Sequence, residues 1–198
     1  IQMESVRHAG DFGNFSTQLF LVGLLENCAM VPIPQLHQQF DWDCGVACVL
    51  MVLKYMEKVV SIEDLFEICK EENCFESVWT IDLCYILRRF NVKIKMYTVT
   101  LGLDMRYENE KFYKEIIHKD KQRVLEKFQN AGLNKIDVAS KSLTIVDILN
   151  HLSQFGPVIA LVDSNILDCP VCRGDVQEDS NCDNPCFMPY SGILSTKI

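Results

Sequence analysis

The sequence predicts an α+β domain, and the order of its hydrophobic patterns is the main reason. Helical patterns come first along the chain and strand patterns become prominent later, whereas an α/β fold would alternate the two regularly. The chain has 198 residues, of which 48% are apolar and 23% are charged. These values are typical of one globular domain with a sizeable core, and no internal repeat divides it.

The first half of the chain contains three expected helices and one expected strand. Residues 45–56 are apolar on nearly all sides, which is typical of a buried central helix. The sequence Ser61-Ile62-Glu63-Asp64 has the pattern of a capping box and opens a second helix. A third helix is expected over residues 80–90. Residues 92–96 then alternate between polar and apolar, which predicts a strand with one exposed face.

The second half continues with two helices and a strand. Residues 112–129 form an amphipathic, highly charged pattern, and Asp120 is a point where that helix could be interrupted. Thr144-Ile145-Val146-Asp147 is another capping box, and its helix is expected to end at Gly156. Residues 157–162 are apolar throughout, which predicts a strand buried on both faces.

The charge of the chain limits the partners it is expected to have. The formal net charge is -8 and the isoelectric point is about 5.0, whereas nucleic-acid binding generally requires a basic surface. No apolar run reaches the roughly 20 residues of a membrane-spanning helix. We therefore expect a protein or peptide partner of unknown identity, and neither nucleic acid nor a membrane.

The N-terminal residues and the cysteines indicate where the protein works. Residues 1–30 show no sustained period and are expected to be an extension without regular structure. Acidic residues flank the apolar run at residues 19–25 and no small-x-small cleavage site is clear, so a secretory signal is disfavoured. Six of the ten cysteines are scattered through apolar or helical stretches, which suits a reducing compartment. The expected location is the cytoplasm or the nucleus.

A cysteine stands at the expected start of the first helix. The first-turn amides of a helix stabilise a thiolate, so Cys44 is a candidate nucleophile. Gln38, or else Gln39, can supply an amide N–H to an oxyanion beside the backbone N–H of Cys44. The alternative interpretation is a buried structural cysteine with an unrelated glutamine upstream. Cys48, one turn later, is expected to pack in the core or to be a redox partner of Cys44.

The residues around Cys44 also resemble a known family. The pattern of residues 38–48, Q-x-x-x-x-D-C-G-x-A-C, is similar to the N-terminal motif of the bacteriocin-processing cysteine peptidases and their papain-like relatives. Three separated blocks resemble, more specifically, the guanylyl cyclase domain-containing protein family. These blocks are Trp42-Asp43-Cys44-Gly45, Trp79-Thr80-Ile81-Asp82-Leu83, and Thr100-Leu101-Gly102-Leu103-Asp104 with Tyr107, Asn109, Phe112 and Tyr113.

The resemblance covers roughly residues 31–192 and leaves residues 193–198 as a divergent tail. It implies a papain-like cysteine hydrolase fold, whereas the family's name implies formation of cyclic GMP from GTP. A cyclase needs carboxylates that hold Mg²⁺ or Mn²⁺ and a cradle for the triphosphate. Asp82 and Asp104 can be proposed as such acids, but no Gly-rich phosphate loop is found. We therefore favour thiol chemistry, with a cyclase and a non-catalytic interaction module as alternatives.

The resemblance also implies that a catalytic group is missing. The resembled fold carries its general-base histidine in a Gly-His-aromatic sequence that begins a late strand. Here Tyr190-Ser191-Gly192 is followed by Ile193. We therefore expect a truncated isoform or fragment that lacks the family's remaining C-terminal strands and has little or no hydrolase activity. None of the four histidines is predicted to replace the base: they are His8, His37, His118 and His151.

Four cysteines near the C-terminus form a separate cluster. Their spacing is C-x2-C-x9-C-x3-C, from the four residues Cys169, Cys172, Cys182 and Cys186. Four thiolates can close a tetrahedral zinc site, which would be structural. The gap of nine residues is shorter than that of the usual four-cysteine sites, so free or disulfide-paired thiols are the favoured alternative. No other cofactor is expected.

Overall fold

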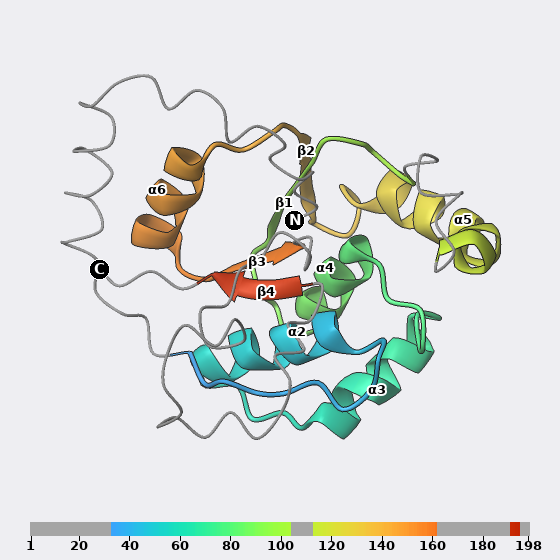
Figure 1. The fold of residues 1–198 in the computed structure, drawn as a ribbon, viewed down its shortest axis with the longest axis horizontal. Helices are drawn as coiled ribbons and strands as arrows, with labels where there is room; N and C mark the ends of the chain where they lie inside the picture. Colours follow the sequence, from blue (N-terminus) through green and yellow to red (C-terminus); the bar gives the residue numbers. More distant parts are fainter. Residues whose placement is uncertain (1–32, 104–112, 162–190, 195–198) are drawn as a thin grey trace, which may run out of the picture.

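The computed structural model describes residues 33–103, 113–161 and 191–194, which combine helices and strands (Figure 1). The α+β prediction is therefore confirmed. The helices are α2 (Cys44–Tyr55), α3 (Ile62–Glu71), α4 (Thr80–Arg89), α5 (Tyr113–Asn130) and α6 (Ile145–Phe155). The strands are β1 (Lys95–Thr98), β2 (Asp137–Ser140), β3 (Val158–Leu161) and β4 (Ser191–Leu194).

The strands form two separate pairs, one parallel and one antiparallel. β1 pairs in parallel with β2, with Lys95 opposite Asp137, and α5 is the crossover between them. β3 pairs antiparallel with β4, with Ile159 opposite Ile193. Helix α2 packs against both β3 and β4, and α6 packs against β3 (Figure 1). The second strand pair therefore joins the helical half of the domain to α6.

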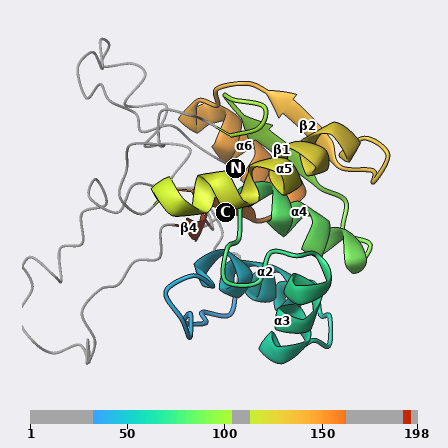
Figure 2. The ribbon, with the colours of Figure 1, turned by 90° about the vertical axis from the view of Figure 1, so that its right-hand side faces the viewer.

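Helix α2 is the centre of the main hydrophobic core. Its residues 45–53 are all buried, and Val46, Val49 and Leu53 are completely so. α3 and α4 pack against it, and α4 lies between these helices and α5 (Figures 1 and 2). A Cβ atom at position 45 would lie 3.0 Å from both methyl carbons of Leu83, so Gly45 permits the close approach of α2 and α4.

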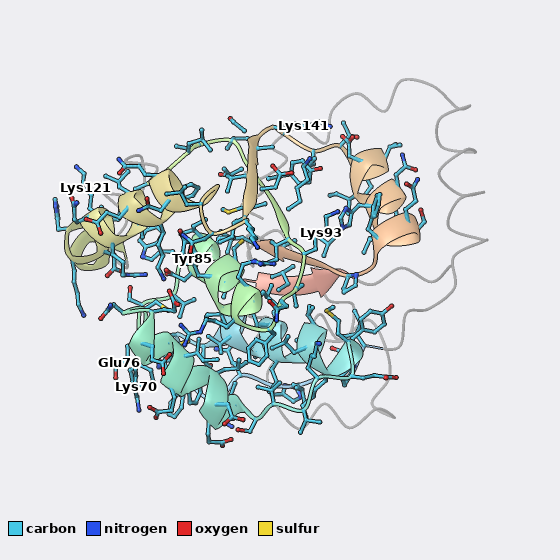
Figure 3. All side chains as sticks on the ribbon, turned by 180° about the vertical axis from the view of Figure 1, so that it is seen from behind. Lys70, Glu76, Tyr85, Lys93, Lys121 and Lys141 are labelled. Atoms are coloured by element: carbon cyan, nitrogen blue, oxygen red, sulfur yellow. The ribbon has the colours of Figure 1, made fainter. Side chains whose placement is uncertain are left out.

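A second, smaller core lies between α4, α5 and the parallel strand pair. Its buried members are Ile81, Cys84, Met96, Val124, Ala131 and Ile136. Tyr85 lies between α4 and α5 (Figure 3), and its hydroxyl donates to the carbonyl oxygen of Lys127 at 2.8 Å. The charged residues of α5 that face away from this core, such as Lys121, are exposed (Figure 3).

The helix predictions are confirmed, and most of the observed helix ends differ from the expected ones by a single residue. Ser61 and Thr144 are both the N-caps of complete capping boxes, and Gly156 ends α6 with a φ of 106°. The suggested interruption at Asp120 is wrong, because α5 is continuous there. The Asp120 carboxylate is buried and accepts a hydrogen bond from Trp79 Nε1 at 2.8 Å, so it links α5 to α4 instead.

The strand predictions are less accurate. The strand expected at residues 92–96 begins only at Lys95, because Asn91 and Val92 are used to end α4: the N–H of Val92 donates to the carbonyl of Leu87. β3 is not buried on both faces, since Ile159 and Leu161 are only half-buried. β2 has no counterpart among the predicted elements. Among the residues described, no helix is both long and apolar enough to cross a membrane.

Candidate functional site

Cys44 is the first residue of α2 and lies half-buried at the end of the central helix. The other cysteines in the described part of the chain are all buried: Cys48, Cys69, Cys74 and Cys84. The predicted nucleophile is therefore the one cysteine of the described residues that a reagent or substrate can approach without local unfolding.

The loop that precedes Cys44 is held by a buried carboxylate. Asp43 is completely buried and accepts hydrogen bonds from the backbone N–H groups of Gln39 at 3.1 Å and Phe40 at 3.0 Å. Asp43 is also the N-cap residue of α2, yet its side chain makes no cap hydrogen bond, and the first turn contains no acidic residue. The Asp43 side chain therefore leaves the first-turn N–H groups of α2 without a side-chain cap, although its carboxylate lies next to Cys44 in the sequence.

The predicted oxyanion donor lies in the same loop. Gln38 Nε2 donates to the carbonyl oxygen of Phe40 at 2.8 Å, which uses one of the two N–H groups of the amide. Its Oε1 atom is buried and has no hydrogen-bond partner among the described residues. Gln38 thus remains a predicted oxyanion donor, with one N–H still able to serve a substrate.

Aromatic side chains cover the outer side of this loop. Phe40 and Trp42 stack with their ring centroids 6.1 Å apart, and Trp42 packs edge-on against Phe75 at 4.8 Å. Phe66 of α3 contacts all three of these rings. Phe40 is 51% exposed, so an apolar surface stands a few residues from Cys44.

Among the described residues, the structure records no contact between a histidine and Cys44. His37 and His118 are exposed, and His118 lies on α5. His151 lies on α6, contacts the ring of Phe155 at 5.2 Å, and has its pKa lowered by burial. Position 193, where the papain-like resemblance implied a histidine, lies within β4, the strand that packs against α2. The residue there is Ile193.

Asp82, the acid that could be proposed for a cyclase, is used to join two helices. It is completely buried, and its carboxylate lies 2.5 Å from Arg123 Nη1 and 2.9 Å from Lys127 Nζ, both on α5. It also accepts from the backbone N–H of Trp79 at 2.8 Å. Burial opposes the charge on Lys127, but its interactions with Asp82, Cys74 and Glu72 together outweigh this effect and raise the pKa of the ammonium group.

The buried cysteines have environments unlike that of Cys44. Cys69 and Cys74 are hydrogen-bonded to each other where α3 ends, which lowers the pKa of Cys69 and raises that of Cys74. Cys84 donates to the carbonyl oxygen of Thr80, and burial raises the pKa of Cys84 to about 11. Thiols that are buried in this way are protected from reagents and substrates.

The other predicted site residues lie outside the described part of the chain. They are Asp104 and the cluster of Cys169, Cys172, Cys182 and Cys186. Within the described ranges, no group of three or more histidine, cysteine, aspartate or glutamate residues is arranged to hold a metal ion. Zinc binding by the cluster therefore stays a prediction.

The fold and the site define an α+β domain with an accessible cysteine at the start of its central helix. Residues 33–192 match the guanylylate cyclase family, and the chain belongs to that family. It is 39% identical over 172 residues to Guanylyl cyclase 1 of Arabidopsis thaliana, a match that covers 86% of this chain. The chain spans about 61% of the length of that curated relative. No solved structure matches the chain.

Proposed function

We propose that this chain is a papain-like, cysteine-hydrolase-type domain in which Cys44 occupies the nucleophile position. One observation carries the proposal: Cys44 is half-buried at the first residue of α2, where no side chain makes a cap hydrogen bond to the first-turn amides. Cysteine nucleophiles depend on this kind of helix terminus, because its amides favour the thiolate over the thiol. The contact of α2 with β4 supports the same arrangement.

The chemistry assigned to the site is addition of the Cys44 thiolate to a carbonyl carbon. The oxyanion that forms would accept hydrogen bonds from the backbone N–H of Cys44 and the second N–H of Gln38. A general acid must then protonate the leaving group, which is the usual task of a histidine. Since position 193 is an isoleucine, we expect little or no hydrolysis by this chain.

The second candidate is a guanylyl cyclase, and the observation in its favour is the name carried by the Arabidopsis relative. A cyclase would require acids whose oxygens are free to hold Mg²⁺ or Mn²⁺. Asp82 is not such an acid, because Arg123 and Lys127 occupy its carboxylate. A cyclase site in this chain would therefore have to use other residues.

The thiol proposal is tested by alkylation. The folded chain is treated with limiting iodoacetamide at several pH values, and the modification of each cysteine is followed by peptide mass spectrometry. We expect Cys44 to react faster than glutathione at pH 6–7, because first-turn amides without a side-chain cap can stabilise an anion at this position. The matched control is Cys48→Ser, which leaves Cys44 in place. A Cys44 rate no greater than that of glutathione contradicts the proposal.

The cyclase alternative is tested on the same preparations with GTP and Mn²⁺. Formation of cyclic GMP that persists in Cys44→Ser would overturn the ranking of the two functions. An activated Cys44 without cyclic GMP supports the hydrolase-type assignment. A folded chain that fails both assays would indicate the remaining alternative, a non-catalytic module that binds a protein or peptide.

A further inference from the structure

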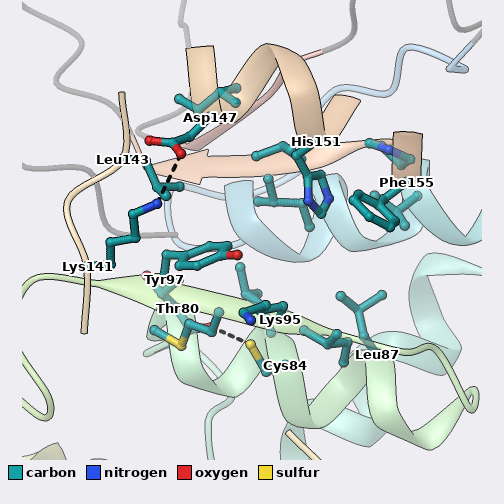
Figure 4. Close-up of a pocket in the computed structure, with 18 of the residues that line it drawn as sticks. Thr80, Cys84, Leu87, Lys95, Tyr97, Lys141, Leu143, Asp147, His151 and Phe155 are labelled. Carbon is teal, nitrogen blue, oxygen red and sulfur yellow. Dashed lines mark hydrogen bonds and ion pairs between the residues drawn. The ribbon is translucent and has the colours of Figure 1, made fainter. Parts of the chain in front are cut away.

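A cavity of about 270 Å³ lies between α6 on one side and α4 and β1 on the other (Figure 4). Neither Cys44 nor Gln38 lines it, so it is distinct from the candidate thiol site. Small-molecule sites in proteins commonly measure about 300–1,000 Å³. At slightly below this range, the cavity is suited to a compact small molecule rather than to an extended peptide.

The inner part of the cavity is apolar. Val52 of α2, Leu83 of α4 and Ile148 of α6 all line it and are buried. Nearer the surface, the half-buried ring of His151 and the ring of Phe155, which is 74% exposed, line the α6 side with their centroids 5.2 Å apart (Figure 4). Burial lowers the pKa of His151. A flat, apolar ring is the kind of group that such walls accommodate.

The polar part of the lining has a positive charge. Lys95 and Lys141 line the cavity together with a single carboxylate, that of Asp147, although the whole chain has a net charge of -8. Lys95 Nζ also lies 5.5 Å from the ring centroid of Tyr97, its neighbour on the same face of β1. The cavity therefore combines apolar walls with two cations drawn from separate segments.

Both lysines can exchange their present partners at little cost. Lys141 pairs with Asp147 at 3.0 Å and Lys95 with Asp137 at 3.1 Å. The side chains of the lysines are 52% and 45% exposed, and ion pairs with that exposure contribute little to stability. An anionic ligand could take the place of either aspartate without leaving a buried charge unpaired.

We propose that this cavity binds a small planar aromatic molecule that carries one carboxylate or phosphate group. The ring would lie against Ile148 and His151, with Phe155 at the rim, and the anionic group would be bound by Lys95 and Lys141. The hydroxyl of Tyr97 and the polar side chains of α6 at the cavity would add hydrogen bonds. The proposal is independent of the chemistry assigned to Cys44.

The test is calorimetric titration of the full chain with three probes: 2-naphthoate, its neutral analogue 2-naphthamide, and adenosine monophosphate. We expect an acidic probe to bind and the amide to bind about tenfold more weakly, as the loss of a charge-assisted hydrogen bond predicts. Tighter binding of the naphthoate identifies the aromatic carboxylate as the natural chemistry. Tighter binding of the monophosphate identifies the nucleotide-like phosphate instead.

Variants locate the binding. Lys141→Gln and Lys95→Gln should each weaken binding of the acidic probe about tenfold. Gln154→Trp adds a ring at an exposed residue of the lining and should reduce binding without disturbing the core. The matched control is Lys58→Gln, an exposed lysine outside the lining. The proposal is overturned if no acidic probe binds at millimolar concentration, or if the Lys58 variant weakens binding as much as the two cavity variants.

Discussion

Asp43 and Asp82 are both completely buried, and each belongs to one of the sequence blocks that carry the family resemblance, but their partners differ. Asp43 is held by two backbone N–H groups of the residues just before it, at 3.1 and 3.0 Å. Asp82 is held by two cations of α5, and the bond to Arg123 spans 41 positions in the sequence. One carboxylate shapes a loop, and the other joins two helices.

The difference shows how a buried acid can serve either a site or a fold. Asp43 takes its hydrogen bonds from the backbone of residues 39 and 40, and Cys44 beside it is half-buried. Because Asp82 depends on Arg123 and Lys127, its carboxylate is enclosed and unavailable to a metal or substrate. The same side chain thus has a local role in one block and a long-range role in the other.

The largest effect is expected for Asp82→Ala. The substitution leaves Arg123 and Lys127 largely buried, with side-chain exposures of 15% and 11%, and without their shared partner. We expect a loss of about 3–5 kcal/mol in the free energy of unfolding, measured by urea denaturation. Asp137→Ala, at an exposed ion pair, is the control and should have little effect. Equal losses of stability in the two variants would show that the buried ion network of Asp82 contributes no more than an exposed ion pair.

Asp43→Ala should have a smaller effect on stability but a specific effect on the site. Two backbone N–H groups lose their acceptor, which costs about 1–3 kcal/mol if they stay buried. The loop would also loosen, so the alkylation rate of Cys44 should change. The neighbouring exposed Asp41→Ala serves as the control and should alter neither quantity. A stable Asp43→Ala chain with an unchanged Cys44 rate would show that the carboxylate does not organise the loop.

In the two exposed capping boxes, an aspartate pairs with the N-cap residue at the start of a helix. Substituting an N-cap residue is expected to lower stability less than the two changes above. The Ser61 hydroxyl accepts from the N–H of Asp64 at 3.1 Å at the start of α3. Ser61→Ala should lower the free energy of unfolding by about 1 kcal/mol, whereas Ser61→Thr keeps the hydroxyl and most of the stability. The free energy of unfolding of both variants is measured by urea denaturation. A Thr variant as unstable as the Ala variant would argue against the cap as the cause.

The smallest effect concerns the pH dependence contributed by Asp147. Its pKa is lowered from 3.8 to about 2, first by the backbone N–H of Thr144 and then by Lys141. A lowered pKa in the folded state means that this stabilisation is present above pH 4 and is lost as the pH falls toward 2. The stability difference between wild type and Asp147→Asn, followed by thermal unfolding from pH 6 to 2, should therefore shrink. If the stability difference between the two proteins grew as the pH fell, the pKa of Asp147 would be raised in the folded state, not lowered.

Much of the helical structure could be predicted because its signals are local. The capping boxes at Ser61 and Thr144 join residues three apart, and Gly156 ends α6 by its own backbone conformation. The position of Cys44 at a helix start was readable for the same reason. The onset of β1 was misplaced because the end of α4 extends to Val92, through a hydrogen bond that the alternation of residues does not reveal.

The roles of the polar residues were harder to predict, because their partners lie far away in the sequence. Asp82 could be proposed for metal binding, and only its contacts with α5 show that it is part of an ion network. Asp120 looked like a helix breaker, although it binds Trp79 of the preceding helix. The parallel pairing of β1 with β2 was not predicted either, since a short strand with a weak pattern is identified mainly by its neighbour.

By itself the sequence determined the class of fold, the limits of the helices, the family and the placement of Cys44 at a helix terminus, because each depends on residues close together in the chain. Only the tertiary structure decided that Asp82 is enclosed by cations, that Cys44 is accessible where four other cysteines are buried, and that α6 and β1 bound a cavity with two lysines. These features arise when segments far apart in sequence pack together, and burial then fixes which charges can remain.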